Sequence, residues 1–187
     1  VILFTSAGPE EGKSTVMVNM GAALSEMGRK VLLVEADLRR PVLDRYFKVS
    51  LGKGISGVLS GAATLDEAVQ PTGYDNLYVV AAGVKPPNPG ELVASEAMRS
   101  VLDRVRHYAD YVLVDSPPAI AVSDAAVISA LCDGVLMVFH GQKTTVQAAR
   151  RAVERLDSIN ATLLGVVLNG VDIRNPDYVD YRSYYPT

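Results

Sequence analysis

The stretch SAGPEEGKST, residues 6–15, carries the most specific chemical pattern in the chain. It follows an apolar run and precedes a segment with helical spacing, so it connects a predicted strand to a predicted helix. In such a loop, backbone N–H groups surround phosphates, Lys13 reaches the β and γ oxygens, and the Ser14 hydroxyl binds Mg²⁺. The pattern usually opens with glycine, where this chain has Ala7, which is also small. Rather than a plain glycine turn, we predict a nucleotide-binding P-loop formed by Gly8, Pro9, Glu10, Glu11, Gly12, Lys13, Ser14 and Thr15.

Acidic residues follow two further apolar runs, Glu35 and Asp37 in VEADLRRP and Asp115 in VLVDSPP. An extended backbone points Glu35 and Asp37 the same way, so beside a triphosphate they suit holding Mg²⁺ and accepting a proton from an attacking hydroxyl. The alternatives are that Asp37 caps a turn while Glu35 is solvated, and that Asp115 belongs to a strand-end turn. Because a P-loop is nearby, we predict a catalytic group of Lys13, Glu35, Asp37 and Asp115, with Ser14, Asp37 and Asp115 on the metal side.

Four of the nine tyrosines lie in the last ten residues, at Tyr178, Tyr181, Tyr184 and Tyr185. The segment 174–187 lacks both strand and helix periodicity and is polar between its tyrosines. We therefore predict a mobile tail that follows a domain of residues 1–173. The alternative is an edge strand or a packed aromatic cap, which would need more aliphatic neighbours than Val179.

The elements that must position these groups alternate along the chain. Short apolar, β-branched runs occur at 1–5, 30–34, 77–82, 111–115, 134–139 and 163–169, and helical spacing occurs at 14–28, 95–108 and 145–158. This alternation predicts an α/β fold, a mostly parallel sheet with helices on both faces, in which ligands bind at the carboxyl ends of the strands. Prolines in residues 86–93 predict a rigid loop that leads into a helix from about Glu91.

Composition narrows the class of protein. The 187 residues are 49% hydrophobic and 21% charged, as in one folded soluble domain, and the net charge of -3 argues against a nucleic-acid partner. The single cysteine, Cys132, excludes an intrachain disulfide, and His107 and His140 lack metal-ligand spacing. No apolar run approaches the ~18 residues of a membrane span. Because Val1 already lies inside an apolar run, we expect a piece of a longer protein.

Together, AGPEEGKST, VLLVEADLRRP, PPNPGELV, YVLVDSPP and the tyrosine-rich end resemble the bacterial tyrosine kinases of capsular and extracellular polysaccharide systems. The resemblance implies the P-loop fold of cell-division and plasmid-partition ATPases and an activity that uses ATP and Mg²⁺. It further implies autophosphorylation of the tail tyrosines in trans within a ring of subunits, regulating polysaccharide synthesis and export. The implied partners are a transmembrane activator or co-polymerase region, fused upstream or separate, and a phosphotyrosine phosphatase. The implied location is the cytoplasmic face of the membrane.

By position, the resemblance assigns Lys13, Ser14 and Thr15 to the first nucleotide motif and Asp115 to the third. Glu35, Asp37 and Arg39 fall in the second motif, where the family has aspartate in place of Glu35. Asn169 matches an adenine contact, with a strand-end turn as the alternative. The partition ATPases have a signature lysine where this chain has Gly8, which favours the kinase. The alternatives are an ATPase assembly switch and a weakly active regulatory paralogue, the latter favoured by the longer Glu35 side chain.

Overall fold

The computed structural model describes residues 1–50 and 52–172. The predicted tail 174–187, with Tyr178, Tyr181, Tyr184 and Tyr185, lies outside the described residues, and so does the predicted domain boundary at residue 173. Within the described residues no helix is both long enough and apolar enough to cross a bilayer.

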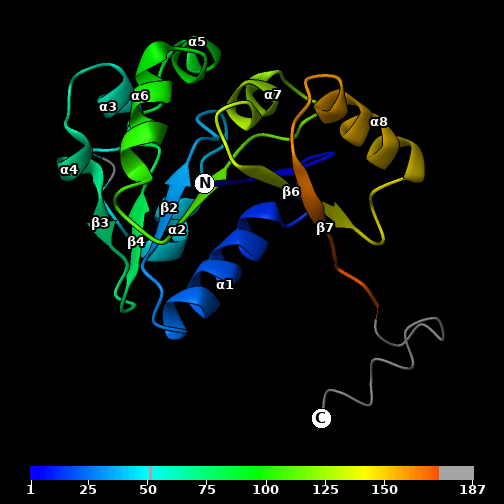
Figure 1. Ribbon diagram of the computed structural model, residues 1–187, viewed down its shortest axis with the longest axis horizontal. Helices are drawn as coiled ribbons and strands as arrows, with labels where there is room; N and C mark the ends of the chain where they lie inside the picture. The colour runs from blue at the N-terminus through cyan, green and yellow to red at the C-terminus, as the bar shows by residue number, and fades with distance from the viewer. Residues whose placement is uncertain (51, 173–187) are drawn as a thin grey trace.

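A seven-stranded sheet forms the centre of the molecule, in the order β3-β4-β2-β5-β1-β6-β7 (Figure 1). All neighbouring strands are parallel except β3 and β4. The predicted mostly parallel sheet is therefore confirmed. The six predicted strands are present, and the antiparallel edge strand β3 was not predicted. The strands are β1 (Ile2–Ser6), β2 (Val31–Glu35), β3 (Gln70–Pro71), β4 (Leu77–Val80), β5 (Tyr111–Asp115), β6 (Gly134–His140) and β7 (Leu163–Asn169).

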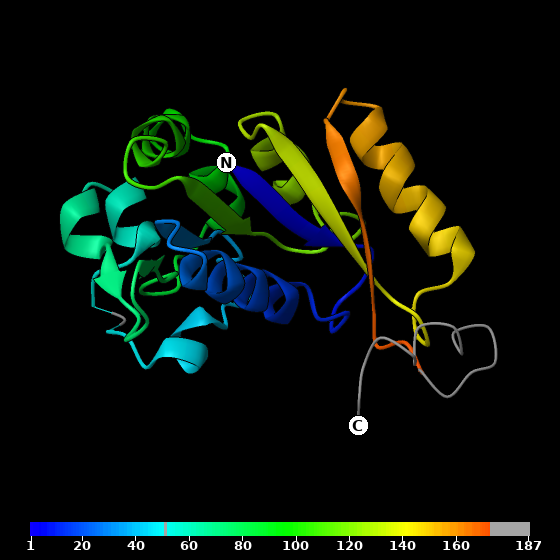
Figure 2. The same cartoon turned by 60° about the horizontal axis from the view of Figure 1, so that its bottom comes forward.

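Helices cover both faces of the sheet (Figures 1 and 2). One face carries α1 (Lys13–Glu26) and α2 (Leu43–Phe47). The other carries α3 (Ile55–Leu59), α4 (Leu65–Ala68), α5 (Pro89–Val93), α6 (Glu96–Val105), α7 (Asp124–Ser129) and α8 (Val146–Asp157). The three long predicted helices correspond to α1, α6 and α8. The helix expected from about Glu91 is α5, and it begins two residues earlier.

Alternating side chains on the strands create two apolar layers. On β2, Leu32 and Val34 pack into the layer under α6, whereas Val31 and Leu33 pack into the layer over α1. Both layers are fully buried on this strand, as expected of a central parallel strand covered on both faces. The two packed apolar layers fix the positions of the strand ends. The predicted site residues lie at or just after those ends.

Sheet order determines which strand ends meet. β1 lies between β5 and β6, so the loop after Ser6 lies directly beside the end of β5 (Figure 2). In the strand register Phe4 pairs with Asp115, and Glu35 also pairs with Asp115. The three acidic or glycine-rich strand ends singled out in the sequence are thus neighbours in space.

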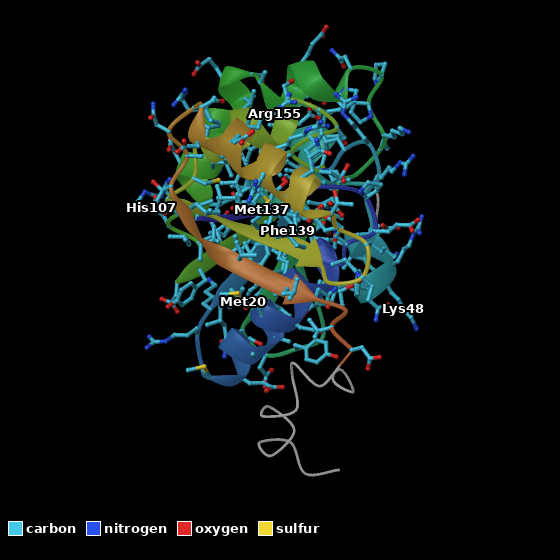
Figure 3. All side chains as sticks on the ribbon, turned by 90° about the vertical axis from the view of Figure 1, so that its right-hand side faces the viewer. Met20, Lys48, His107, Met137, Phe139 and Arg155 are labelled. Atoms are coloured by element: carbon cyan, nitrogen blue, oxygen red, sulfur yellow. The ribbon has the colours of Figure 1, made fainter. Side chains whose placement is uncertain are left out.

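The opposite edge strand, β7, is less covered. Figure 3 faces this edge, with α8 on one side of the sheet and α1 on the other. Leu164, Val166 and Leu168 are about half exposed there, at 53%, 51% and 48%. In the same view Lys48 lies toward the carboxyl ends of the strands and His107 lies toward their amino ends, which places His107 away from the predicted site.

Candidate active site

The loop between β1 and α1 has the backbone of a phosphate-binding loop. Gly12 immediately precedes α1 and has a φ of 87°, a left-handed conformation that side chains disfavour. A Cβ at Gly12 would lie 2.0 Å from the Nδ2 atom of Asn169. Glu10 also has a positive φ, 59°. The loop therefore requires glycine at position 12 for two separate reasons, and α1 starts at Lys13 with its N-terminal N–H groups facing the loop.

Glu11 braces this loop from inside. Its carboxylate is buried and accepts a hydrogen bond from the Gly8 N–H at 2.9 Å. The other carboxylate oxygen of Glu11 accepts a hydrogen bond from the Thr144 hydroxyl, in the loop after β6. Asn169, at the end of β7, donates from Nδ2 to the carbonyl oxygen of Glu11 at 3.0 Å. The predicted adenine contact of Asn169 remains a prediction, while its contact with the P-loop is direct.

Thr144 was not singled out in the sequence. It lies a few residues beyond an apolar strand, at the sheet edge where ligands bind, and this position is the signal that could have drawn attention to it. Its hydroxyl oxygen also accepts the backbone N–H of His140 at 2.8 Å. The loop after β6 is thus tied both to its own strand and to the P-loop.

Lys13, Ser14 and Asp115 form one contact group. The Lys13 ammonium lies 2.8 Å from Asp115 and 3.6 Å from Asp37. The Ser14 hydroxyl donates a hydrogen bond to the second carboxylate oxygen of Asp115. Asp115 is completely buried, and Lys13 and Asp37 are almost so, with side-chain exposures of 11% and 5%. The structure therefore brings together four of the predicted residues.

Burial and opposite charges compete in this group. Burial alone would lower the pKa of Lys13, but the carboxylates of Asp115, Asp37 and Glu35 outweigh it and raise the pKa above its ordinary value. Lys13 is therefore a permanent cation. Burial raises the pKa of Asp115, against the attraction of Lys13 and the hydrogen bond from Ser14.

Glu35 lies apart from the pocket and is not solvated, so that alternative is wrong. It is completely buried, and one carboxylate oxygen accepts the backbone N–H groups of Val42 and Leu43, both at 2.8 Å. Its other oxygen, Oε1, is the one buried side-chain polar atom without a hydrogen-bond partner among the described residues. Burial, and secondarily the charge of Asp115, raises the pKa of Glu35 to about 8. The longer side chain thus holds the start of α2.

Asp37 performs both tasks that the sequence left open. One carboxylate oxygen accepts the backbone N–H groups of Arg39 at 3.3 Å and Arg40 at 2.9 Å, which caps the turn after β2. The other oxygen faces Lys13. Because the turn fixes the carboxylate, Asp37 presents a preoriented oxygen to the pocket.

Arg39 forms a bond that its sequence position did not indicate. Its Nε and Nη2 atoms lie 2.9 Å and 3.2 Å from the two carboxylate oxygens of Asp124, the buried first residue of α7. This paired arrangement ties the loop after β2 to the layer of helices on the other face. Arg39 also lines the pocket, so its predicted nucleotide contact remains a prediction.

An open pocket of about 810 Å³ lies over these groups. At its border the Tyr46 hydroxyl lies 2.7 Å from the Thr15 hydroxyl, and this contact joins α2 to α1. The lining residues are Ser6, residues 8–15, Asp37, Arg39, Arg40, Pro41, Val42, Arg45, Tyr46, Lys85 and Pro118. The pocket is thus bounded by the P-loop, the turn after β2, α2 and residue 85.

The residues fit a magnesium–nucleotide complex in kind. Ser14, Asp37 and Asp115 supply the hydroxyl and carboxylate oxygens that Mg²⁺ prefers. Within residues 1–50 and 52–172 no group of three or more His, Cys, Asp or Glu residues could hold a metal alone. This sparse donor set matches the usual binding of Mg²⁺ by one or two carboxylates together with substrate phosphates.

Comparison with known proteins defines the class first. Residues 1–183 match the ParA family, described as NUBPL iron-transfer P-loop NTPases. The solved septum site-determining protein MinD from Pyrococcus horikoshii OT3, complexed with Mg-ADP, has 25% identity and a TM-score of 0.77, covering 89% of this chain and 68% of that chain. The chain is therefore a P-loop NTPase of the ParA and MinD type.

Within that class, bacterial kinases match over almost the whole chain. Tyrosine-protein kinase YwqD of Bacillus subtilis (strain 168) is 36% identical over 187 residues, 100% of this chain and 77% of YwqD. Tyrosine-protein kinase etk of Escherichia coli (strain K12) is 34% identical over 171 residues, 91% of this chain but 24% of etk. The solved kinase domain of Escherichia coli ETK has 35% identity and a TM-score of 0.88, covering 91% of this chain and 67% of that chain. The chain belongs to the bacterial tyrosine-protein kinases, as its motifs predicted.

Proposed function

We propose that the chain is a protein-tyrosine autokinase that uses ATP and Mg²⁺ to phosphorylate the tail tyrosines of a neighbouring copy, at Tyr178, Tyr181, Tyr184 and Tyr185. The observation that carries the proposal is the contact group of Lys13, Ser14 and Asp115 beneath a braced P-loop. Phosphoryl transfer depends mainly on positioning and on neutralising charge, and this group offers both.

In this mechanism one set of residues binds the phosphates and another binds the metal. The P-loop N–H groups and Lys13 bind the phosphates, while Ser14, Asp37 and Asp115 hold the metal. A bound Mg²⁺ would neutralise part of the phosphate charge. The tyrosine O–H proton passes to Asp37, the phenolic oxygen bonds to the γ phosphorus, and the bond from that phosphorus to the β–γ bridging oxygen breaks to release ADP.

The proton acceptor is better assigned to Asp37 than to Glu35. Asp37 lines the pocket and one of its oxygens faces Lys13, whereas Glu35 does not line the pocket and is completely buried. Free tyrosine has a pKa of about 10, so a carboxylate beside the metal eases its deprotonation. In this reading the glutamate in place of the family's aspartate leaves the acceptor intact.

The wider setting is part of the same proposal. The chain spans 24% of etk, which is consistent with a kinase domain that works with a transmembrane activator or polysaccharide co-polymerase region, fused or separate. We propose that the kinase acts at the cytoplasmic face of the membrane, in a ring of copies, and regulates polysaccharide synthesis and export. A phosphotyrosine phosphatase would reverse the modification.

A second candidate is an ATPase switch, which the similarity to MinD favours. A switch passes the phosphoryl group to water, so phosphate release would not depend on the tail. A weakly active regulatory paralogue differs again, because it binds nucleotide and shows neither labelling nor release.

The test uses purified chain with ATP and Mg²⁺, read by mass spectrometry for phosphotyrosine and by phosphate release. The autokinase predicts tail label that disappears in Lys13→Met and in the variant with all four tail tyrosines changed to Phe. Lys30→Met, which changes a lysine before β2, and Tyr74→Phe, which changes an exposed tyrosine, are matched controls that retain the label. Phosphate release that persists in the Tyr→Phe variant without any label on the parent chain identifies the switch instead.

A further inference from the structure

The mouth of the pocket carries three cations without partners. Arg40, Arg45 and Lys85 line the pocket and are exposed, and none forms an ion pair with another residue in the part of the chain that the structure describes. The two deeper cations differ, because Lys13 is paired with Asp115 and Arg39 is paired with Asp124. We call Arg40, Arg45 and Lys85 the cationic rim.

Three separate elements hold the rim in place. Arg40 lies in the turn that Asp37 caps, and its own N–H donates to that carboxylate. Arg45 lies on α2, which the contact between Tyr46 and Thr15 fixes against α1. Lys85 follows Val84, whose carbonyl oxygen accepts the Ser56 hydroxyl at 2.7 Å. The rim therefore has a supported backbone at each cation.

The rim exceeds what a nucleotide needs. In the proposed function, the phosphates are already bound by the P-loop N–H groups, the start of α1 and Lys13. Three further unpaired cations at the mouth create a field that attracts a second anionic group approaching from solvent. Residues 177–181 supply such a group, because Asp177 immediately precedes Tyr178 and Asp180 immediately precedes Tyr181, while the two arginines of the tail, at 174 and 182, lie on either side of this segment.

We infer that the cationic rim is a docking surface for the Asp-Tyr segment 177–181 of a second copy of this chain. The carboxylate of Asp177 or Asp180 pairs with a cation of the rim, while the adjacent phenol enters the pocket toward Asp37. The rim thus favours Tyr178 and Tyr181, which an acidic residue precedes, over Tyr184 and Tyr185, which follow Ser183 and Tyr184. This inference rests on the proposed autokinase function and adds to it how the acceptor is selected.

The expected size of the effect is modest. Single screened ion pairs at a surface change binding by a factor of roughly two to five, and complementary charges act mainly on encounter and specificity. Contacts made by a part of the acceptor that does not react are uniform in ground and transition states, so they alter KM and leave kcat unchanged.

The test supplies the acceptor as a peptide of residues 174–187, with the full chain as enzyme and its own four tail tyrosines changed to Phe. The parent peptide is compared with a peptide carrying Asp177→Asn and Asp180→Asn, and with one carrying Asp177→Lys and Asp180→Lys. The enzymes are the chain with an unaltered rim, Arg45→Glu, Lys85→Glu, and Arg150→Glu as a charge-matched control on an exposed position of α8. KM and kcat for peptide and for ATP are measured at two salt concentrations.

The inference predicts that the Asn peptide raises KM about 5- to 10-fold with the unaltered rim, and that high salt removes this difference. Arg45→Glu raises KM for the parent peptide but not for the Asn peptide, and the Lys peptide partly restores it. Equal KM values for the parent and Asn peptides at low salt overturn the inference while the kinase function stands. An equal rise in KM for ATP assigns the rim to the nucleotide and also overturns it. Absence of label on every peptide, with every enzyme, overturns both the inference and the proposed function.

Discussion

Glu35 is a strand-end carboxylate that binds backbone N–H groups and does not line the pocket. Its side chain is one methylene longer than the aspartate that the family resemblance implies at this place, and it reaches the N–H groups of Val42 and Leu43. Its second oxygen is buried without a partner among the described residues. A buried carboxyl in this position is stable as the neutral acid, which needs no counter-charge.

The first prediction concerns the pH dependence of stability. Glu35 has a pKa of about 8 in the folded chain, against 4.5 ordinarily. Between these values the folded state holds a proton that the unfolded state has released, so the free energy of unfolding falls as pH rises from 5 to 8 and levels off above 8. Glu35→Gln reduces this slope, so the stability of the variant relative to the parent grows with pH and reaches roughly 3–5 kcal/mol at pH 8.

Urea unfolding at pH 5, 6.5 and 8, without metal or nucleotide, measures the effect. Glu26→Gln, at an exposed position near the end of α1, is the matched control and retains the parent slope. Parallel stability curves for the parent and Glu35→Gln would show that Glu35 is ionised in the folded chain.

The second prediction concerns Gly12. Alanine there meets both a φ of 87° and the Asn169 amide, whereas alanine at Gly28 meets a φ of 76° with no heavy atom within 4 Å. Gly28→Ala therefore isolates the backbone cost, about 1–2 kcal/mol. We expect Gly12→Ala to lose more stability than Gly28→Ala and to weaken nucleotide binding at least tenfold, as measured by thermal unfolding and nucleotide titration. Equal losses in the two variants would contradict the close approach of Asn169.

At the scale of single residues, the sequence predicts the site residues that directly follow strands. It misses residues that belong to the site only through contacts with distant side chains. Lys13, Ser14, Asp37 and Asp115 meet because the carboxyl ends of parallel strands share one edge. Thr144, Tyr46 and Asp124 contact the site through side chains far away in the sequence, and no spacing rule connects them to it. Their roles required the packed structure.

Among the elements, the loop after β6 supports the P-loop from outside, together with the end of β7. Thr144 donates to Glu11, which in turn accepts from Gly8, so a hydrogen-bonded chain runs from this loop to the phosphate-binding backbone. Hydrogen bonds to a charged group contribute about 1.5–3 kcal/mol. The P-loop geometry therefore depends on an element more than a hundred residues away.

The third prediction tests this brace. Thr144→Val keeps the shape of the side chain and removes its hydroxyl, so that both a Glu11 carboxylate oxygen and the His140 backbone N–H lose this partner. We expect affinity for ATP, measured by titration calorimetry, to fall by at most about 10- to 150-fold, the factor that corresponds to 1.5–3 kcal/mol. Thr144→Ser retains the hydroxyl and should retain most of the affinity. A Thr144→Val variant with parent affinity would mean that Gly8 alone holds Glu11.

Element prediction succeeds where periodicity has room to appear. α1, α6 and α8 are 10 to 14 residues long and show it, whereas α2, α3, α4 and α7 have four to six residues, about one turn, and do not. β3 has two residues, one of them Pro71, and forms because β4 offers an open edge. Tertiary packing, not local preference, determines these short elements.

For the whole molecule, the sheet order couples the nucleotide site to global stability. The site draws residues from β1, β2, β5, β7 and their loops, so unfolding of any central strand disperses it. A ligand that binds only such an assembled site stabilises the entire fold by mass action.

The fourth prediction follows from this coupling. At an ATP concentration 100-fold above Kd, with Mg²⁺ present, the free energy of unfolding rises by about 2.7 kcal/mol, which raises Tm by roughly 5–10 °C for a domain of this size. EDTA should remove most of the shift, and Lys13→Met should abolish it. Differential scanning fluorimetry measures the shift, and a Tm independent of saturating Mg-ATP would argue against a nucleotide site at Lys13.

The central position of β1 has a further consequence during synthesis. β1 pairs with β5 and β6. The first of these strands begins at Tyr111, and the second ends at His140. A nascent chain that has emerged as far as α6 contains the complete glycine-rich motif but neither strand on which its loop rests. At ~5–20 residues per second, synthesis from the end of β1 to the end of β6 takes roughly 5 to 30 s. The apolar β1 strand is unprotected on the ribosome for that interval, so within this domain a strand that is made early is among the last to find its neighbours.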